Sequence, residues 1–181
     1  MQLLTKDGIR CDGCGLELKN DFLYHSIDFK VAKTKYGQHI SLNELQYADI
    51  VETFDYCSKC IEKINDKVVQ TNLNNANRKT GLRYCDFTNV DLMKQDTYLY
   101  SSITKVNVKH SGVPYTCDKC NAATNNPVSV CKCGNNKYSR HADVKTEPRS
   151  LELFLTDQIL PQFVNRRKDL KAQGNDWNVT S

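Results

Sequence analysis

The chain of 181 residues is long enough for one ordinary domain or two small ones. Charged residues make up 25% of it, the mean hydropathy is -0.60, and no apolar run approaches the roughly 18 residues of a membrane-spanning helix. The first six residues also lack the apolar stretch of a signal peptide. We therefore expect a cytoplasmic protein, in the host cytoplasm if it is viral, with no membrane partner.

The net charge of +4 counts every thiol as neutral. Two zinc ions, each held by four thiolates, would add a charge of about −4 and bring the sum close to zero. Residues 1–74 carry slightly more acidic than basic side chains, whereas residues 75–181 carry an excess of basic ones. The charge therefore favours a polyanionic partner only for the second half of the chain.

Eight of the nine cysteines lie in close pairs. Two thiolates separated by two residues can bind one tetrahedral zinc ion, and two such pairs complete a structural site. A redox-active C-x-x-C would be expected only once, and a reducing cytoplasm disfavours disulfides. The spacing predicts two zinc ions, one held by Cys11, Cys14, Cys57 and Cys60 and the other by Cys117, Cys120, Cys131 and Cys133.

Residues 1–70 are expected to form the first zinc module. Gly13 and Gly15 allow a tight turn around the first cysteine pair, and the alternation in residues 23–31 predicts a strand. A helix is predicted over residues 58–69, with Cys60 in its first turn, where the amide dipoles favour a thiolate. Knuckle, hairpin and helix together resemble the treble-clef zinc finger, a resemblance that implies an architecture and no particular function.

Residues 71–81 are polar and rich in asparagine, which predicts a linker. Residues 82–145 are expected to form a β-rich second module, whose segment 113–141 resembles a zinc ribbon. Its last pair is C-x-C in place of C-x-x-C, which leaves two interpretations of Cys85 open. Cys85 is either the fourth ligand, with Cys117, Cys120 and one cysteine of the last pair, or a small buried thiol. We favour the buried thiol because the ribbon set is complete without Cys85.

An internal repeat connects the two modules. The stretch that begins at Cys11 is similar to one that begins at Cys85, where Thr88 stands in place of Cys14. Each stretch is followed by a C-x-x-C pair, so Cys117 is matched with Cys57 in this alignment. A chance similarity between two hairpins rich in aspartate is the alternative.

Residues 146–181 are expected to form a strand, a helix and a tail. Pro161 suits the start of the helix and Gly174 its end. Arg166, Arg167 and Lys168 give this helix a basic surface, which could contact phosphates or could simply be solvated. The whole chain is thus predicted to be α+β, with two small zinc-stabilised modules, treble-clef-like and then ribbon-like, and a C-terminal helix.

An enzyme is not expected. The main enzymatic alternative is an HNH-type nuclease, because its active site is built on a treble clef. Such a site needs a general-base histidine beside an aspartate, with a metal-binding residue on the following helix. His25 and His39 lie in the hairpin region without an adjacent aspartate, and the helix offers only Asn65. His110 and His141 likewise lack a partner at metal-ligand spacing.

The remaining function classes are binding classes. We expect a regulatory zinc protein whose target is nucleic acid or the transcription machinery; the alternatives are a protein-interaction adaptor and a structural component of a viral or phage assembly. The abundance of asparagine and lysine resembles the composition of small phage or low-GC bacterial zinc proteins. No small-molecule substrate is indicated. The candidate nucleic-acid contacts are Lys132, Lys137, Arg140, Arg166, Arg167 and Lys168.

Overall fold

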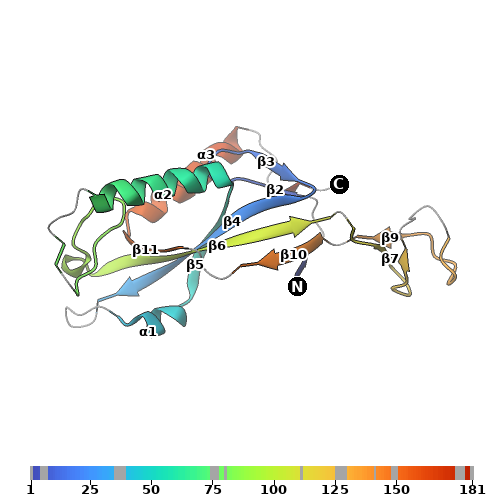
Figure 1. Cartoon of the computed structure of the whole chain (residues 1–181), viewed down its shortest axis with the longest axis horizontal. Helices are drawn as coiled ribbons and strands as arrows, with labels where there is room; N and C mark the ends of the chain where they lie inside the picture. The colour runs from blue at the N-terminus through green and yellow to red at the C-terminus, as the bar shows by residue number, and fades with distance from the viewer. Residues whose placement is uncertain are drawn as a thin grey trace.

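The structure is a computed structural model that describes residues 2–4, 8–34, 40–73, 78–79, 81–110, 112–124, 130–140, 142–147, 151–173 and 178–179. Within these residues the chain forms one six-stranded sheet and two three-stranded sheets, accompanied by helices (Figure 1). The expected α+β class is therefore confirmed. No helix in the described ranges is long and apolar enough to cross a membrane.

Two long strands form the centre of the large sheet. Strands β4 (Phe22–Lys33) and β6 (Thr97–Lys109) pair in antiparallel fashion along nearly their whole length. On the outer side of β4 lies β5 (Ile50–Tyr56). The outer side of β6 carries two strands, which pair with different parts of it. These are β10 (Ala142–Thr146), which is followed outward by β1 (Gln2–Leu4), and β11 (Leu151–Thr156).

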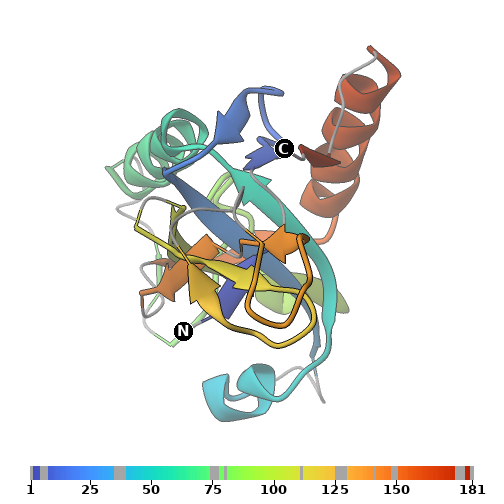
Figure 2. The same ribbon diagram turned by 90° about the vertical axis from the view of Figure 1, so that its right-hand side faces the viewer.

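Two helices cover one face of this sheet, α2 (Ser58–Leu73) and α3 (Ile159–Ala172) (Figure 2). Alternate residues of β4 point toward them, because side chains of a strand alternate between its two faces. The ring of Phe163 on α3 packs 5.2 Å from Phe29 and 5.6 Å from Phe54, centroid to centroid. Phe29 and Phe54 are fully buried, and full burial of a phenylalanine stabilises the fold by roughly 1.5–3 kcal/mol.

The main hydrophobic core contains residues from both halves of the chain. Ile27 and Phe54 from the first half are buried in the same cluster as Ile103 and Leu155 from the second. Residues on both sides of the predicted linker at 71–81 thus share one core. Residues 71–73 continue helix α2, and residues 74–77 and 80 of the expected linker lie outside the described residues.

A hairpin with the same backbone hydrogen bonds occurs twice. Strands β2 (Gly8–Arg10) and β3 (Glu17–Lys19) form the first, and the bridge between Tyr84 and Asp91, ahead of the short helix η1 (Leu92–Lys94), marks the second. In each, the N–H of the cysteine, Cys11 or Cys85, donates to the carbonyl five residues later, and its carbonyl accepts from the N–H four residues later. The predicted repeat is present here.

The repeat continues into different elements from those that the sequence alignment matched. Asp86 bonds to Phe154 on β11 as Asp12 bonds to Asp55 on β5. Strand β11 and helix α3 are therefore the counterparts of β5 and α2. Matching Cys117 and Cys120 with Cys57 and Cys60 was wrong, because Thr156 and Ile159 occupy those positions of the second copy.

Each copy carries a different insertion between its long strand and its returning strand. The first copy has α1 (Leu42–Gln46), and the second has the small sheet of β7 (Tyr115–Cys117), β8 (Ala123–Thr124) and β9 (Tyr138–Ser139). Because β4 and β6 are antiparallel, the two insertions lie at opposite ends of the molecule (Figure 1).

The C-terminal helix begins two residues earlier than the proline had suggested. Helix α3 starts at Ile159, so Pro161 lies within its first turn, where a backbone N–H has no partner inside the helix. The expected C-terminal strand is β11. A further short strand, β12 (Asn178–Val179), pairs with β2.

Candidate metal centres

The first metal centre begins with the turn between β2 and β3. Cys11 and Cys14 lie on this turn, and the Gly13 N–H donates to the sulfur of Cys11 at 3.3 Å. A side chain at Gly13 would have its Cβ only 3.0 Å from the sulfur of Cys60. Glycine therefore suits this position, because a larger residue would force the turn and the second cysteine pair apart by a few tenths of an ångström.

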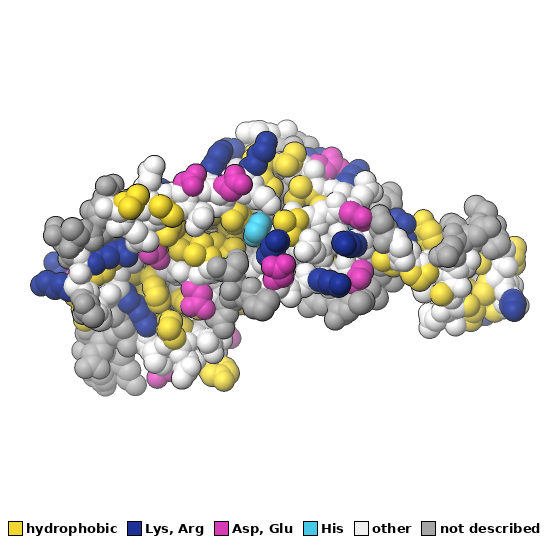
Figure 3. Space-filling view, viewed as in Figure 1, with side chains coloured by type: hydrophobic (Ala, Val, Ile, Leu, Met, Phe, Trp, Pro, Cys, Tyr) yellow, Lys and Arg dark blue, Asp and Glu magenta, His cyan; other side chains and the backbone are white. Residues whose placement is uncertain are grey.

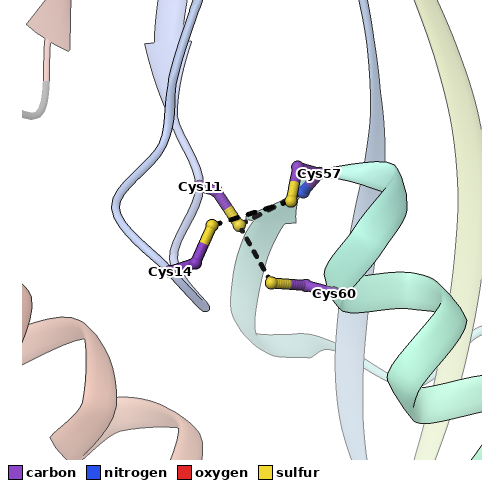
Figure 4. Close-up of side chains that lie close together, drawn as sticks. All are labelled: Cys11, Cys14, Cys57 and Cys60. Atoms are coloured by element: carbon purple, nitrogen blue, oxygen red, sulfur yellow. Dashed lines mark hydrogen bonds between the residues drawn. The ribbon is translucent and has the colours of Figure 1, made fainter.

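The other two ligands of this centre come from the start of α2. Cys57 precedes the helix and Cys60 lies in its first turn, so all four sulfurs converge on one point (Figure 4). The Cys57 N–H donates to the sulfur of Cys11 at 3.2 Å. The sulfurs of Cys11 and Cys60 are 3.7 Å apart, as are those of Cys14 and Cys57.

These separations suit a tetrahedral ion. Zinc–sulfur bonds of about 2.3 Å in a tetrahedron place the sulfurs about 3.8 Å from one another. In each of the two clusters all four sulfurs lie within 4.8 Å of one another. Either cluster could therefore hold a metal ion with four protein ligands, and a closed coordination shell of this kind serves a structural role.

Electrostatics in the first centre favour a cation. Burial raises the pKa of the Cys11 thiol to about 11, although the N–H groups of Cys57 and Gly13 lower it. Burial, followed by the charge of Cys11, raises the pKa of Cys60. Burial also raises the pKa of Cys57, but hydrogen bonds from Cys60 and Cys11 outweigh it and hold this pKa below its usual value. A divalent ion would offset the cost of burying several thiolates together.

Helix α3 also contacts the first centre. The guanidinium Nε of Arg166 donates to the carbonyl of Gly13 at 3.0 Å, which holds the cysteine turn against this helix. Because a zinc ion with four thiolates has a net charge of about −2, the guanidinium would be attracted to the loaded centre. The sequence pattern did not indicate this role, since the two residues are far apart in the chain.

The second metal centre lies in the small sheet at the far end of the molecule. The sulfurs of Cys117 and Cys133 are 3.6 Å apart, and those of Cys120 and Cys131 are 3.4 Å apart. The turn at Cys117 repeats the backbone hydrogen bonds of the Cys11 turn. Asn121 in this turn has a positive φ of 63°, and Gly15 at the same position of the Cys11 turn has a positive φ of 77°. The sequence-predicted ligand sets are thus brought together in both clusters.

The C-x-C pair of the second centre has a tighter turn. The Cys131 carbonyl accepts from the N–H of Gly134, only three residues later, and Gly134 has a φ of 90°. The side-chain amide of Asn135 then donates to the sulfur of Cys117 at 3.4 Å. The one-residue difference from a C-x-x-C is therefore accommodated by glycine, and all four sulfurs still converge.

The thiols of the second centre differ in acidity. Hydrogen bonds from the Cys120 backbone and the Asn135 side chain lower the pKa of Cys117 to about 6. The Ala122 N–H lowers the pKa of Cys120, but hydrogen bonds with Cys131 and Cys133 outweigh it and raise the value to about 12. One thiol of this centre is therefore more acidic than an ordinary cysteine thiol.

The two centres differ most in exposure to solvent. In the first, Cys11, Cys57 and Cys60 are buried in the main core and only Cys14 is exposed. In the second, Cys117 is buried, whereas Cys120 and Cys133 are exposed. Chelators and oxidants therefore have freer access to the second centre.

Among the residues that the structure describes, Cys85, His25 and His110 are not part of either cluster. Cys85 is fully buried in the main core, as the favoured interpretation predicted. His25 lies on β4 with its Nδ1 atom buried and without a hydrogen-bond partner. His39 and His141 lie outside the described residues. His110 is buried, and its Nδ1 lies 2.6 Å from the carbonyl of Asn20.

The predicted basic contacts fall into two groups. On α3, Arg167 forms a 2.9 Å ion pair with Glu52 and lies over the ring of Phe54. Arg166 and Arg167 therefore both contact other parts of the fold, whereas Lys168 is exposed to solvent. The arginines of α3 thus help to attach the helix to the sheet.

The second group surrounds the second metal centre. Lys132 and Lys137 are exposed, and the guanidinium of Arg140 lies over the ring of Tyr115. Beside them is an open pocket of about 420 Å³. Its lining comprises Cys120, Ala122, Ala123, Thr124, Val130, Cys131, Lys132 and Tyr138.

Comparison with protein families, with curated proteins and with solved structures finds no match to the chain.

Proposed function

We propose that both centres hold zinc and that the chain is a non-enzymatic, regulatory binding protein whose ribbon-like end contacts nucleic acid. In this proposal the first centre is treble-clef-like and stabilises the shared core. The second centre stabilises the small projecting sheet, residues 112–124 and 130–140, which we name the distal module. Four thiolates at each centre match the ligand preference of zinc.

The observation that carries the nucleic-acid proposal is the composition of the distal module. Lys132 and the aromatic ring of Tyr138 line the pocket, and Lys137 and Arg140 belong to the same small module. Basic side chains pair with phosphates, and an aromatic ring can stack on a base. The module also projects from the sheet, so a strand of nucleic acid would reach it without displacing another element (Figure 1).

The test is binding of metal-loaded protein to single-stranded DNA, duplex DNA and RNA over a range of salt concentrations. Lys119, Lys132, Lys137 and Arg140 offer four phosphate contacts, so the log–log salt slope should be about −3 to −4. Lys132→Glu together with Lys137→Glu should weaken binding and reduce the slope by about 2. Lys63→Glu together with Lys94→Glu, two exposed helical positions outside the candidate contacts, is the matched control.

Absence of binding at low salt would reject the nucleic-acid proposal, and equal weakening by both double variants would show that the attraction is not local to the distal module.

The zinc proposal is tested separately by elemental analysis of purified protein. Two zinc ions per chain are expected; one ion per chain, or iron, would contradict it.

A second candidate function, a protein-interaction adaptor, is favoured by a different observation. Several large apolar side chains are exposed around α1, among them Tyr47 and Ile50. Binding through a partly apolar patch would depend only modestly on salt, in contrast to binding at the distal module. The two functions are compatible, because the two surfaces lie at opposite ends of the molecule (Figure 1).

A further inference from the structure

The segment from α1 into β5 exposes a cluster of large apolar side chains. The exposed fractions are 88% for Tyr47, 52% for Ile50 and 46% for Leu42. All three lie within ten residues of sequence, and Val51 next to them is exposed as well. Clusters of exposed apolar residues on a soluble protein commonly mark an interaction surface.

A groove of about 260 Å³ adjoins these apolar residues. Its floor is the sheet face opposite α2 and α3, because alternate residues of β4 and β6 point away from the helices. The side chain of Ile50 forms part of its wall. The complete lining is Asp28, Lys30, Gln46, Ile50, Ser102 and Thr104.

The charges around this groove are mainly negative. Asp28 lies in the floor, and Glu152 lies on the same face of the sheet, since both are paired with Ser102 in the strand register. Glu44 and Asp49 are exposed beside the apolar residues. The Lys30 ammonium donates to the carbonyls of Leu45 and Gln46 at the end of α1, so it is directed toward that helix end.

We propose that this α1 surface, consisting of Leu42, Glu44, Tyr47, Asp49, Ile50 and the adjoining groove, docks a basic and apolar segment of a partner protein. A lysine or arginine of that segment would enter the groove beside Asp28. Its apolar neighbours would cover Ile50 and Tyr47. Nucleic acid is unsuited to this end of the molecule, because the carboxylates would repel its phosphates.

The arrangement of apolar and acidic side chains supports one continuous surface. Figure 3 shows hydrophobic side chains beside acidic ones at the lower left of the view, in the region where Figure 1 draws α1. A polar rim around an apolar centre is typical of protein interfaces, and opposite charge at the rim sets the choice of partner. The proposal is independent of nucleic-acid binding at the distal module.

The test uses a random 12-residue peptide library displayed on phage and selected on metal-loaded protein. Depletion on a Tyr47→Ala, Ile50→Asp variant removes peptides that bind elsewhere. The peptides that remain should carry a net positive charge together with leucine, isoleucine or aromatic residues. Enrichment of acidic or uncharged peptides, or of none, would overturn the proposal.

The most enriched peptide is then measured by fluorescence anisotropy. Glu44→Lys together with Asp49→Lys should weaken its binding roughly tenfold or more, since tenfold corresponds to about 1.4 kcal/mol. Glu62→Lys together with Asp66→Lys on the exposed side of α2 makes the same change of charge and should have little effect. Equal weakening by the two double variants would overturn the proposal, because the attraction would then be general.

Two further measurements separate this surface from other occupants. Lys132→Glu together with Lys137→Glu should leave peptide affinity unchanged, whereas it should weaken nucleic-acid binding. Sedimentation of the wild type and of the Tyr47→Ala, Ile50→Asp variant tests whether a second copy covers the surface. A dimer that the variant dissociates would overturn the proposal in favour of self-association.

Discussion

Asp86 makes with Phe154 the same two backbone hydrogen bonds that Asp12 makes with Asp55. In each pair the aspartate N–H donates to the strand carbonyl, at 2.8 Å and 2.7 Å, and the aspartate carboxylate accepts from the strand N–H, at 2.9 Å and 2.8 Å. Each aspartate thereby occupies backbone groups on the outer edge of a returning strand. Exposed strand edges are sites of unwanted pairing, so this repeated contact protects the outer edges of β5 and β11 at these positions.

A first prediction concerns a metal site that the second copy lacks. Thr88→Cys, Thr156→Cys and Ile159→Cys should complete, with Cys85, a tetrathiolate site equivalent to the first centre. Elemental analysis should then find one metal ion more than in the wild type. Adding Cys85→Ser to the three substitutions is the control and should remove the extra ion. A folded triple variant with unchanged metal content would show that the two copies differ in backbone geometry at these positions.

A second prediction concerns the order in which metal is lost. A chelator should remove the ion of the second centre first, because the sulfurs of Cys120 and Cys133 are exposed. Cys133→Ser should therefore leave the main thermal unfolding transition in place. Cys57→Ser should abolish it, since a structural zinc site contributes on the order of 10 kcal/mol and this one lies in the main core. Calorimetry measures the unfolding transition, and a colorimetric zinc assay measures the release of each ion. Simultaneous loss of the two ions would contradict the expected order.

A third prediction separates packing from nucleic-acid contact on α3. Arg167→Ala should lower the free energy of unfolding by about 1–2 kcal/mol, because it removes the contacts with Glu52 and the Phe54 ring. Lys168→Ala, the neighbouring exposed position, should change it by less than about 0.5 kcal/mol. Urea unfolding of both variants provides the comparison. Equal stability of the two would mean that the arginine contacts do not hold the helix.

A fourth prediction concerns pH. Burial, followed by the charge of Lys105, lowers the pKa of His25 below its usual value near 6.5, while Glu147 opposes the shift. The folded state therefore binds fewer protons than the unfolded state, so stability should fall as the pH decreases through 6.5 toward the folded pKa. One histidine can change the free energy of unfolding by at most about 1.4 kcal/mol per pH unit.

His25→Leu should remove this contribution. Subtracting its urea midpoints from those of the wild type at several pH values between 7.5 and 5.5 isolates the histidine from the effect of acid on the metal centres. A constant difference over this range would contradict the prediction.

The ligand sets could be predicted from sequence because each pair is local and its spacing is diagnostic. The shared sheet could not, since it depends on pairing between β4 and β6, whose partners are about 75 residues apart. The repeat was only partly recovered. The strand register makes Tyr100 the counterpart of Ser26, because Tyr100 is paired with Phe154 as Ser26 is paired with Asp55; the match of Cys117 with Cys57 did not indicate this.

The functions of the basic residues were harder still to predict. Arg166 and Arg167 belong to a run that is typical of phosphate binding, yet their contacts are with Gly13 and Glu52. The partners come from distant parts of the chain, and composition cannot reveal them. Lys132 and Lys137 carry the same sequence signal as these arginines, yet they are exposed in the fold. Only the structure separates the exposed lysines from the arginines that contact other parts of the chain.

The antiparallel pairing of β4 with β6 also sets a distance. A strand rises about 3.3 Å per residue, so the 12 residues of β4 separate α1 from the distal module by roughly 40 Å. Molecules held at both ends would not touch one another and could be bound at the same time. A partner able to reach both ends would instead have its second contact made at a high effective concentration, so two weak contacts could combine into tight binding.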